Sequence, residues 1–158
     1  AVAEALLSFK APPMRWERHV SGQVEFVNDA YNANPLSMRA AVRTFQSFQE
    51  TRRHWLVLAG MLELGPVERE EHVQLGRELA FGQWAGLIVI GERGRWIADG
   101  ALSEGWPAEK TAVCRSRAEA VAVLQKWSNP GDTVLLKASR GEQLEKVLEM
   151  WDAQQAKK

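Results

Sequence analysis

Cysteine is nearly absent from this sequence of 158 residues, in which Cys114 is the only one. A single cysteine excludes an internal disulfide and is typical of a reducing compartment. No neighbouring histidine or cationic cluster would lower the pKa of the Cys114 thiol. We therefore expect a packed thiol on a strand rather than a nucleophile.

An excess of one charge is also missing, because 20 Lys and Arg residues balance 20 Asp and Glu residues. No overall field therefore favours a nucleic acid or a membrane surface as partner. No apolar run approaches the roughly 20 residues that cross a bilayer. The first residues also lack the pattern of a signal peptide, so we expect a cytoplasmic protein.

Two further absences concern chemistry. Neither G-x-x-x-x-G-K-[ST] nor G-x-G-x-x-G occurs, which argues against an independent P-loop or NAD-binding enzyme. The three histidines, His19, His54 and His72, are scattered, and no pair has the spacing of a helical zinc site, so no metal site is predicted. His72 falls early in a predicted helix, where we expect a solvated or hydrogen-bonded ring rather than a catalytic one.

The sequence does contain an alternation of buried-strand and helix patterns. Strand-like runs are predicted at 24–27, 54–59, 87–90, 111–114 and 133–137, and helices at 36–48, 67–81, 93–102, 117–127 and 142–151. Continuous apolar strands separated by helices predict an α/β, Rossmann-like, doubly wound and mostly parallel sheet with helices on both faces.

The chain is the size of one domain, which we place at residues 14–152. Residues 1–13 combine a short helical pattern with a proline pair, as the remnant of a preceding central domain and its linker would. Residues 153–158 are predicted to be a frayed tail.

Polar residues gather where three predicted strands end, at 28–35, 60–65 and 137–141. In the first of these loops Asn34 suits the N-cap position of a helix and Pro35 its first turn. Parallel strands bring their carboxyl ends to one edge, where α/β sheets bind ligands. Lys137 and Arg140 could hold a carboxylate or a phosphate there. The alternative is a capped turn and a solvated last loop.

Four segments, in order along the chain, resemble signatures of the Mur ligase family. Residues 28–41 resemble D-D-x-Y-N-A-N-P-x-S-M-x-A-A, in the wording of the members that add D-alanyl-D-alanine. Residues 61–65 resemble the family's M-x-E-L-G, and 137–141 resemble K-G-S-R-G. Arg15 and Glu17 resemble an upstream R-x-E. The resemblance covers only the C-terminal domain of that family.

The resemblance implies a domain of an ATP-dependent amide ligase of peptidoglycan precursor synthesis, inactive as an isolated fragment. The implied cofactor is ATP with Mg²⁺, the metal being held mainly by the absent central domain. The implied substrates are UDP-N-acetylmuramoyl-tripeptide and D-Ala-D-Ala, and the implied partners are the N-terminal and central domains of the same enzyme. By carry-over, the ATP-binding residues are Arg15, Asp29, Tyr31, Asn32 and Asn34. The amino-substrate residues are Glu63, Lys137, Ser139 and Arg140, with Lys137 and Arg140 also candidates for catalysis.

Five positions depart from the family pattern: Met14, Asn28, Ala59 and Ala138 replace Gly, Asp, Gly and Gly, and Gly60 stands where the family has Asp. Two alternatives stay open. One is a Mur ligase with another amino substrate, against which the Tyr31–Asn34 wording argues. The other is a non-catalytic α/β binding module of the same fold.

Overall fold

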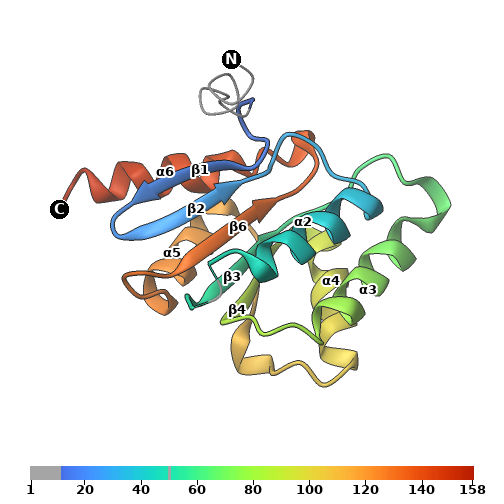
Figure 1. Ribbon diagram of the computed structural model, residues 1–158. Helices are drawn as coiled ribbons and strands as arrows, with labels where there is room; N and C mark the ends of the chain where they lie inside the picture. The colour runs from blue at the N-terminus through green and yellow to red at the C-terminus, as the bar shows by residue number, and fades with distance from the viewer. Residues whose placement is uncertain (1–11, 50) are drawn as a thin grey trace, which may run out of the picture.

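The computed structural model describes residues 12–49 and 51–158, so most of the predicted remnant, residues 1–11, lies outside the described residues. One six-stranded sheet runs through the molecule in the order β1-β2-β6-β3-β4-β5. Only β1 is antiparallel to its neighbour (Figure 1). The strands are β1 Glu17–Ser21, β2 Val24–Asn28, β3 His54–Leu58, β4 Gly86–Ile90, β5 Thr111–Cys114 and β6 Thr133–Lys137.

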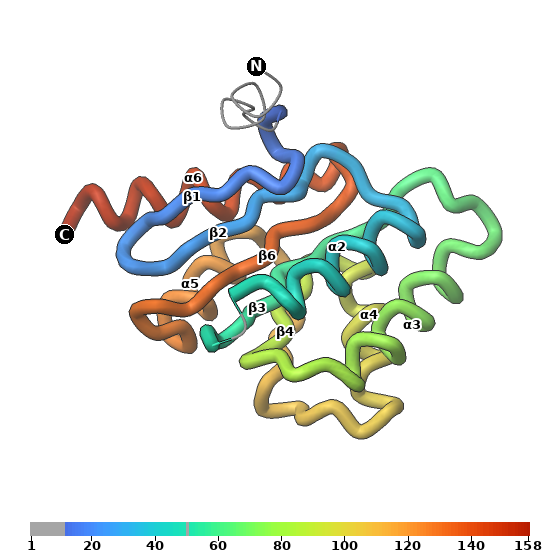
Figure 2. Tube along the Cα trace, in the orientation of Figure 1, coloured from blue at the N-terminus to red at the C-terminus, as the bar shows by residue number. Residues whose placement is uncertain are grey.

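Helices cover both faces of the sheet, as Figures 1 and 2 show. They are α2 Pro35–Ser47, α3 Glu68–Leu79, α4 Gly91–Ser103, α5 Arg117–Trp127 and α6 Glu145–Gln155. Helices α2, α3 and α4 share one apolar cluster with one sheet face, and α5 and α6 share the second cluster with the other face. Strands β2, β3, β4 and β6 are buried along their whole length, because side chains on both faces meet helices. The predicted fold class is confirmed.

Several predicted boundaries were wrong. Helix α4 begins at Gly91 rather than residue 93, and the last helix spans Glu145–Gln155 rather than 142–151. Residues Arg140–Glu142 form a separate 3₁₀ turn, η3. Because α6 continues to Gln155, three residues of the expected frayed tail are helical. Trp151 anchors this helix on the sheet, where its ring packs edge-on against Phe26.

The first strand pair was not predicted. Strand β1 joins β2 through Gly22 and Gln23, both at positive φ (57° and 68°), as two-residue hairpin turns require. Strand β1 is exposed along nearly its whole length, so its sequence carries no apolar run to indicate a strand.

The prediction for Cys114 is confirmed. The thiol is buried in the apolar cluster beneath α5, and burial raises its pKa to about 11. A thiol with this pKa stays protonated near neutrality and is a poor nucleophile. No helix in the described part of the chain is long and apolar enough to cross a membrane.

Candidate functional site

The carboxyl ends of β2 and β6 are joined by a buried ion pair. The Lys137 ammonium, at the end of β6, donates to Asp29 Oδ2 at 2.8 Å and to the Asn32 carbonyl oxygen at 3.1 Å. The side chains of Lys137 and Asp29 are only 4% and 19% exposed. Two of the three polar loops therefore meet at one edge of the sheet, as predicted from the parallel strand order.

Ser139 ties the third polar loop to the other two. Its hydroxyl accepts a hydrogen bond from the Leu62 main-chain N–H at 2.8 Å and donates to the Ala33 carbonyl oxygen at 3.2 Å. The Ser139 N–H also donates to the Gly60 carbonyl oxygen at 2.9 Å. The side chain is buried. These bonds fix the relative positions of all three loops.

Asn34 caps helix α2 as predicted. Its Oδ1 accepts from the Ser37 N–H at 2.8 Å, while the Ser37 hydroxyl accepts from the Asn34 N–H at 3.0 Å, and Pro35 occupies the first turn. This reciprocal capping satisfies N–H groups that the helix leaves open. The side chain of Asn34 is exposed, but its oxygen is already engaged. Only its amide NH₂ group stays free of the cap.

The side chains of Arg15, Tyr31 and Arg140 form an exposed cluster of one aromatic ring and two cations next to these buried contacts. The guanidinium carbon of Arg15 is 4.1 Å from the centroid of the Tyr31 ring, and that of Arg140 is 5.0 Å from it. All three side chains are exposed, and neither arginine forms an ion pair within residues 12–49 and 51–158. Two oriented guanidinium groups are suited to bind phosphate or carboxylate oxygens.

Main-chain bonds that sequence reasoning missed hold this cluster in place. The Tyr31 N–H donates to the Met14 carbonyl oxygen at 3.0 Å, and the Trp16 N–H donates to Asp29 Oδ1 at 3.0 Å. Met14 and Trp16 both adopt positive φ, 59° and 52°. Asp29 thus has both carboxylate oxygens engaged, one by Lys137 and one by the segment that carries Arg15.

The remaining predicted residues lie on the same edge. Asn32 is exposed, and its Oδ1 accepts from the Ala33 N–H at 2.9 Å. Glu63 is exposed on the third loop at φ 63°, and in the described part of the chain it makes no ion pair with the other predicted residues. The structure therefore brings Asp29, Lys137 and Ser139 into direct contact with neighbouring loops and leaves Glu63 apart.

His72 holds the third loop in place through a hydrogen bond to its main chain. A main-chain N–H can only donate, so the 2.8 Å bond from Met61 N makes Nε2 of His72 the acceptor. Nδ1 then carries the proton and donates to the Glu68 carbonyl oxygen at 2.6 Å. The ring is buried, and burial lowers its pKa from the usual value. The expected hydrogen-bonded histidine is confirmed.

We expect acid to destabilise the domain through His72. Below about pH 6.5 the unfolded chain takes up a proton that folded His72 resists, so the free energy of unfolding falls with pH until the lower folded pKa is passed. Urea unfolding between pH 7.5 and pH 4.5 measures this slope. His72→Gln keeps one donor and one acceptor and removes the titration. The account is wrong if this variant shows the same slope as the parent chain.

Three of the five departures from the family pattern have a local explanation. The Ala138 methyl is buried in the apolar cluster under α5 and α6, so it does not face a ligand. A Cβ at Gly60 would collide with the side chains of Arg93 and Glu142, so this chain has no room for a larger residue there unless these side chains move. Asn28 is buried, and its Oδ1 accepts from the Ala30 N–H at 3.3 Å.

Comparisons with known proteins identify the family of this chain. The family model described as Mur ligase, glutamate ligase domain, matches residues 14–140. The chain therefore belongs to the Mur ligase family.

Two curated relatives carry the name UDP-N-acetylmuramoyl-tripeptide–D-alanyl-D-alanine ligase. The Bacillus subtilis protein is 31% identical over 147 residues, covering 92% of this chain and 32% of the relative. The Mycobacterium tuberculosis (strain H37Rv) protein is 38% identical over 160 residues, covering 87% of this chain and 31% of the relative. The chain thus spans about a third of the length of these relatives.

Solved structures of the same kind match the fold. A MurF ligase from Thermotoga maritima in complex with ADP aligns with a TM-score of 0.78 at 27% identity, covering 95% of this chain and 33% of that one. A MurF from Acinetobacter baumannii aligns with a TM-score of 0.83 at 25% identity, covering 96% and 33%. The predicted resemblance is confirmed.

Proposed function

We propose that this chain acts as the C-terminal domain of an ATP-dependent ligase that adds D-Ala-D-Ala to UDP-N-acetylmuramoyl-tripeptide in peptidoglycan precursor synthesis. The observation that carries the proposal is the joining of three loops, each with a family signature, by the Lys137–Asp29 pair and the Ser139 bonds. The names of the relatives supply the substrates. The N-terminal and central domains of the same enzyme are the proposed partners, and the cytoplasm the proposed location.

The exposed residues of the edge fit a nucleotide with phosphates. Arg15 and Arg140 offer guanidinium N–H groups, and the Tyr31 ring between strand and helix offers an aromatic surface. The side chain of Asn32 and the free amide NH₂ of Asn34 can donate to ribose or base acceptors. The described residues hold no group of three His, Cys, Asp or Glu side chains suited to a metal. In the proposed function, Mg²⁺ is held mainly by the central domain.

The buried residues have a different part in the proposed function. The positions of the loops are set by Lys137, Asp29 and Ser139. The side chains of Lys137 and Ser139 form their hydrogen bonds with other protein atoms. They act on the reaction by orienting the exposed groups. As a result, Arg15 and Arg140 are already positioned before a nucleotide binds, and binding does not require them to be reordered.

ATP supplies the phosphoryl group that activates the tripeptide carboxylate for attack by the D-Ala-D-Ala amine. We assign Arg140, the first residue of the 3₁₀ turn after β6, to an oxygen of the reacting groups. We assign the Glu63 carboxylate, which makes no ion pair in the described part of the chain, to the incoming amine. Closure of this edge onto the central domain would exclude water from the activated carboxyl group.

Because this edge is one wall of a composite site, we expect the isolated chain to bind ATP only in the millimolar range. In a titration with ATP that is monitored by the main-chain amide NMR signals, the Tyr31 and Asn32 resonances should shift. The substitution Arg15→Ala should abolish those shifts. Arg95→Ala, an exposed arginine on α4, serves as the control and should leave them unchanged. Sub-micromolar affinity would contradict the composite site, and shifts that bypass this edge would contradict the nucleotide assignment.

A further inference from the structure

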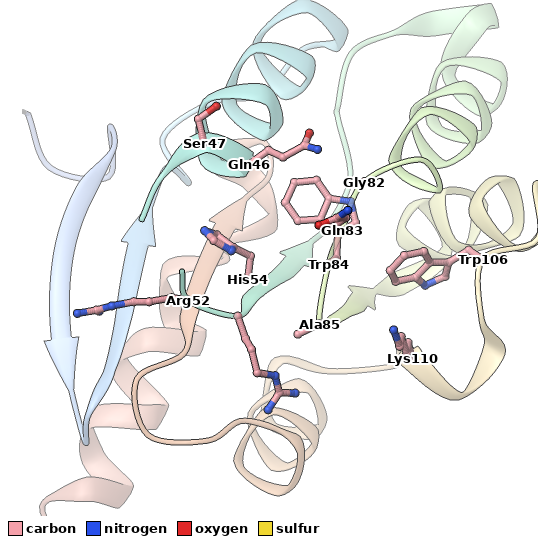
Figure 3. Close-up of a pocket in the computed structure, with 11 residues that line it drawn as sticks. Gln46, Ser47, Arg52, His54, Gly82, Gln83, Trp84, Ala85, Trp106 and Lys110 are labelled. Carbon is pink, nitrogen blue, oxygen red and sulfur yellow. The ribbon is translucent and has the colours of Figure 1, made fainter. Parts of the chain in front are cut away.

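A large cavity of the described structure lies at the opposite edge of the sheet from the proposed nucleotide site. Its volume is about 940 Å³, and it opens between the amino ends of β3, β4 and β5 (Figure 3). This size is within the range of small-molecule sites in proteins. None of the three polar loops contributes to it.

The lining of this cavity is rich in donors and cations. Arg53 and Lys110 belong to its lining, and no acidic side chain is among the lining residues that the structure describes. Arg52 also belongs to the lining, but in Figure 3 it reaches away toward β1 and β2, where it pairs with Glu25. Arg53 is only loosely paired, 3.7 Å from Asp132. Lys110 makes no ion pair within residues 12–49 and 51–158.

One buried donor of the cavity wall is unused. Trp55, Trp84 and Trp151 are buried, and each donates its indole N–H to an oxygen of the protein. Trp106 is only 9% exposed, yet its Nε1 has no hydrogen-bond partner in the described part of the chain. A buried donor without an acceptor is costly, so a small shift of the Trp106 ring that brings its N–H to an acceptor in the cavity would recover free energy. Lys110 lies beside this ring, its Nζ 5.8 Å from the centroid (Figure 3).

We infer that this cavity is a second ligand site, for a small molecule that carries a phosphate group. Two cations in one lining suit an anion with more than one negative charge, which a phosphate monoester has near neutral pH and a single carboxylate lacks. The Trp106 N–H and the amide of Gln83 are further donors for its oxygens, and the Trp106 ring is an apolar surface for its remainder. The inference is independent of the proposed ligase function, because it uses other residues at the other edge.

This inference is tested by titrating the 158-residue chain with inorganic pyrophosphate. The NMR signals of the tryptophan indole N–H groups are recorded during the titration. The chain has seven tryptophans, so Trp106→Phe identifies the Trp106 signal by its loss. We expect a saturable shift of that signal. Lys110→Glu should weaken the affinity at least about tenfold, since it replaces an attractive charge by a repulsive one. Lys146→Glu, on α6 near the opposite edge, should change it less than about twofold.

Three outcomes would overturn the inference: a Trp106 signal that does not saturate, equal affinity in Lys110→Glu, or an equally strong response to acetate. Uridine monophosphate in place of pyrophosphate separates the possible sources of the phosphate. Stronger binding than pyrophosphate indicates a phosphate ester with an aromatic part, and weaker binding indicates a free polyphosphate. Arg15→Ala, which should abolish the ATP response at the other edge, leaves this titration unchanged, so the two proposals fail separately.

Discussion

Replacing Lys137 by methionine is expected to destabilise the domain by about 3–5 kcal/mol, although methionine preserves most of the side-chain volume. The reason is that Asp29 would keep a charge at 19% exposure after losing its partner 2.8 Å away. Against the roughly 5–15 kcal/mol that usually stabilises a domain, this is a large loss. Urea unfolding of the purified chain measures it.

A second substitution separates the ion pair from simple packing. Asp29→Asn removes the buried charge and keeps an oxygen for the Trp16 N–H, so the double variant Asp29→Asn/Lys137→Met should recover more than about 1.5 kcal/mol. Lys126→Met, at an exposed position of α5, should cost no more than about 0.5 kcal/mol. If the single and double variants were equally unstable, the pair would not be what joins the two loops.

Gly76→Ala should be comparably severe, with a loss above about 3 kcal/mol. Helices α3 and α4 cross so closely that a Cβ at Gly76 would collide with the Ile97 carbonyl group, and one at Gly100 would collide with the Val73 carbonyl group. The obstacle is main chain, so relief requires the helices to separate and to open the apolar cluster beneath them.

The control for this helix crossing is Gly105→Ala. At Gly105 a Cβ would meet nothing within 4 Å, but φ is 87°, so only backbone strain of about 1–2 kcal/mol is expected. Thermal and urea unfolding of Gly76→Ala, Gly100→Ala and Gly105→Ala give the comparison. Equal losses in all three would show that strain or helix propensity matters and that close helix packing does not.

The main features of the fold could be predicted because its strands are buried on both faces. A run such as residues 55–58 is apolar throughout, and that pattern fits few structures besides a central parallel strand. Strand β1 lies at the edge with its side chains exposed, so its pairing depends on the Gly22–Gln23 turn rather than on an apolar pattern. The predicted ends of two helices were wrong for a related reason, because main-chain geometry near Gly91 and Arg140 determines where these helices begin.

The gathering of the three polar loops also followed from the sequence, since parallel strands end at one edge. The sequence could not predict which of the polar residues are buried and hold the loops together and which are exposed. Lys137 and Arg140 are three positions apart, yet Lys137 is buried against Asp29 while Arg140 is exposed beside Tyr31. That difference arises because Lys137 is the last residue of β6 and Arg140 begins the next turn. The pair of Lys137 with Asp29 joins residues 108 positions apart, and no local pattern signals it.

A chimaeric enzyme tests most directly whether this edge is one wall of a ligase site. Residues 14–158 of this chain would replace the matching segment of the Bacillus subtilis relative, and phosphate release from ATP would be measured with UDP-N-acetylmuramoyl-tripeptide, with and without D-Ala-D-Ala. We expect release that depends on D-Ala-D-Ala and that falls at least about 100-fold in Arg140→Ala. A folded chimaera that releases no phosphate in response to D-Ala-D-Ala would contradict the account.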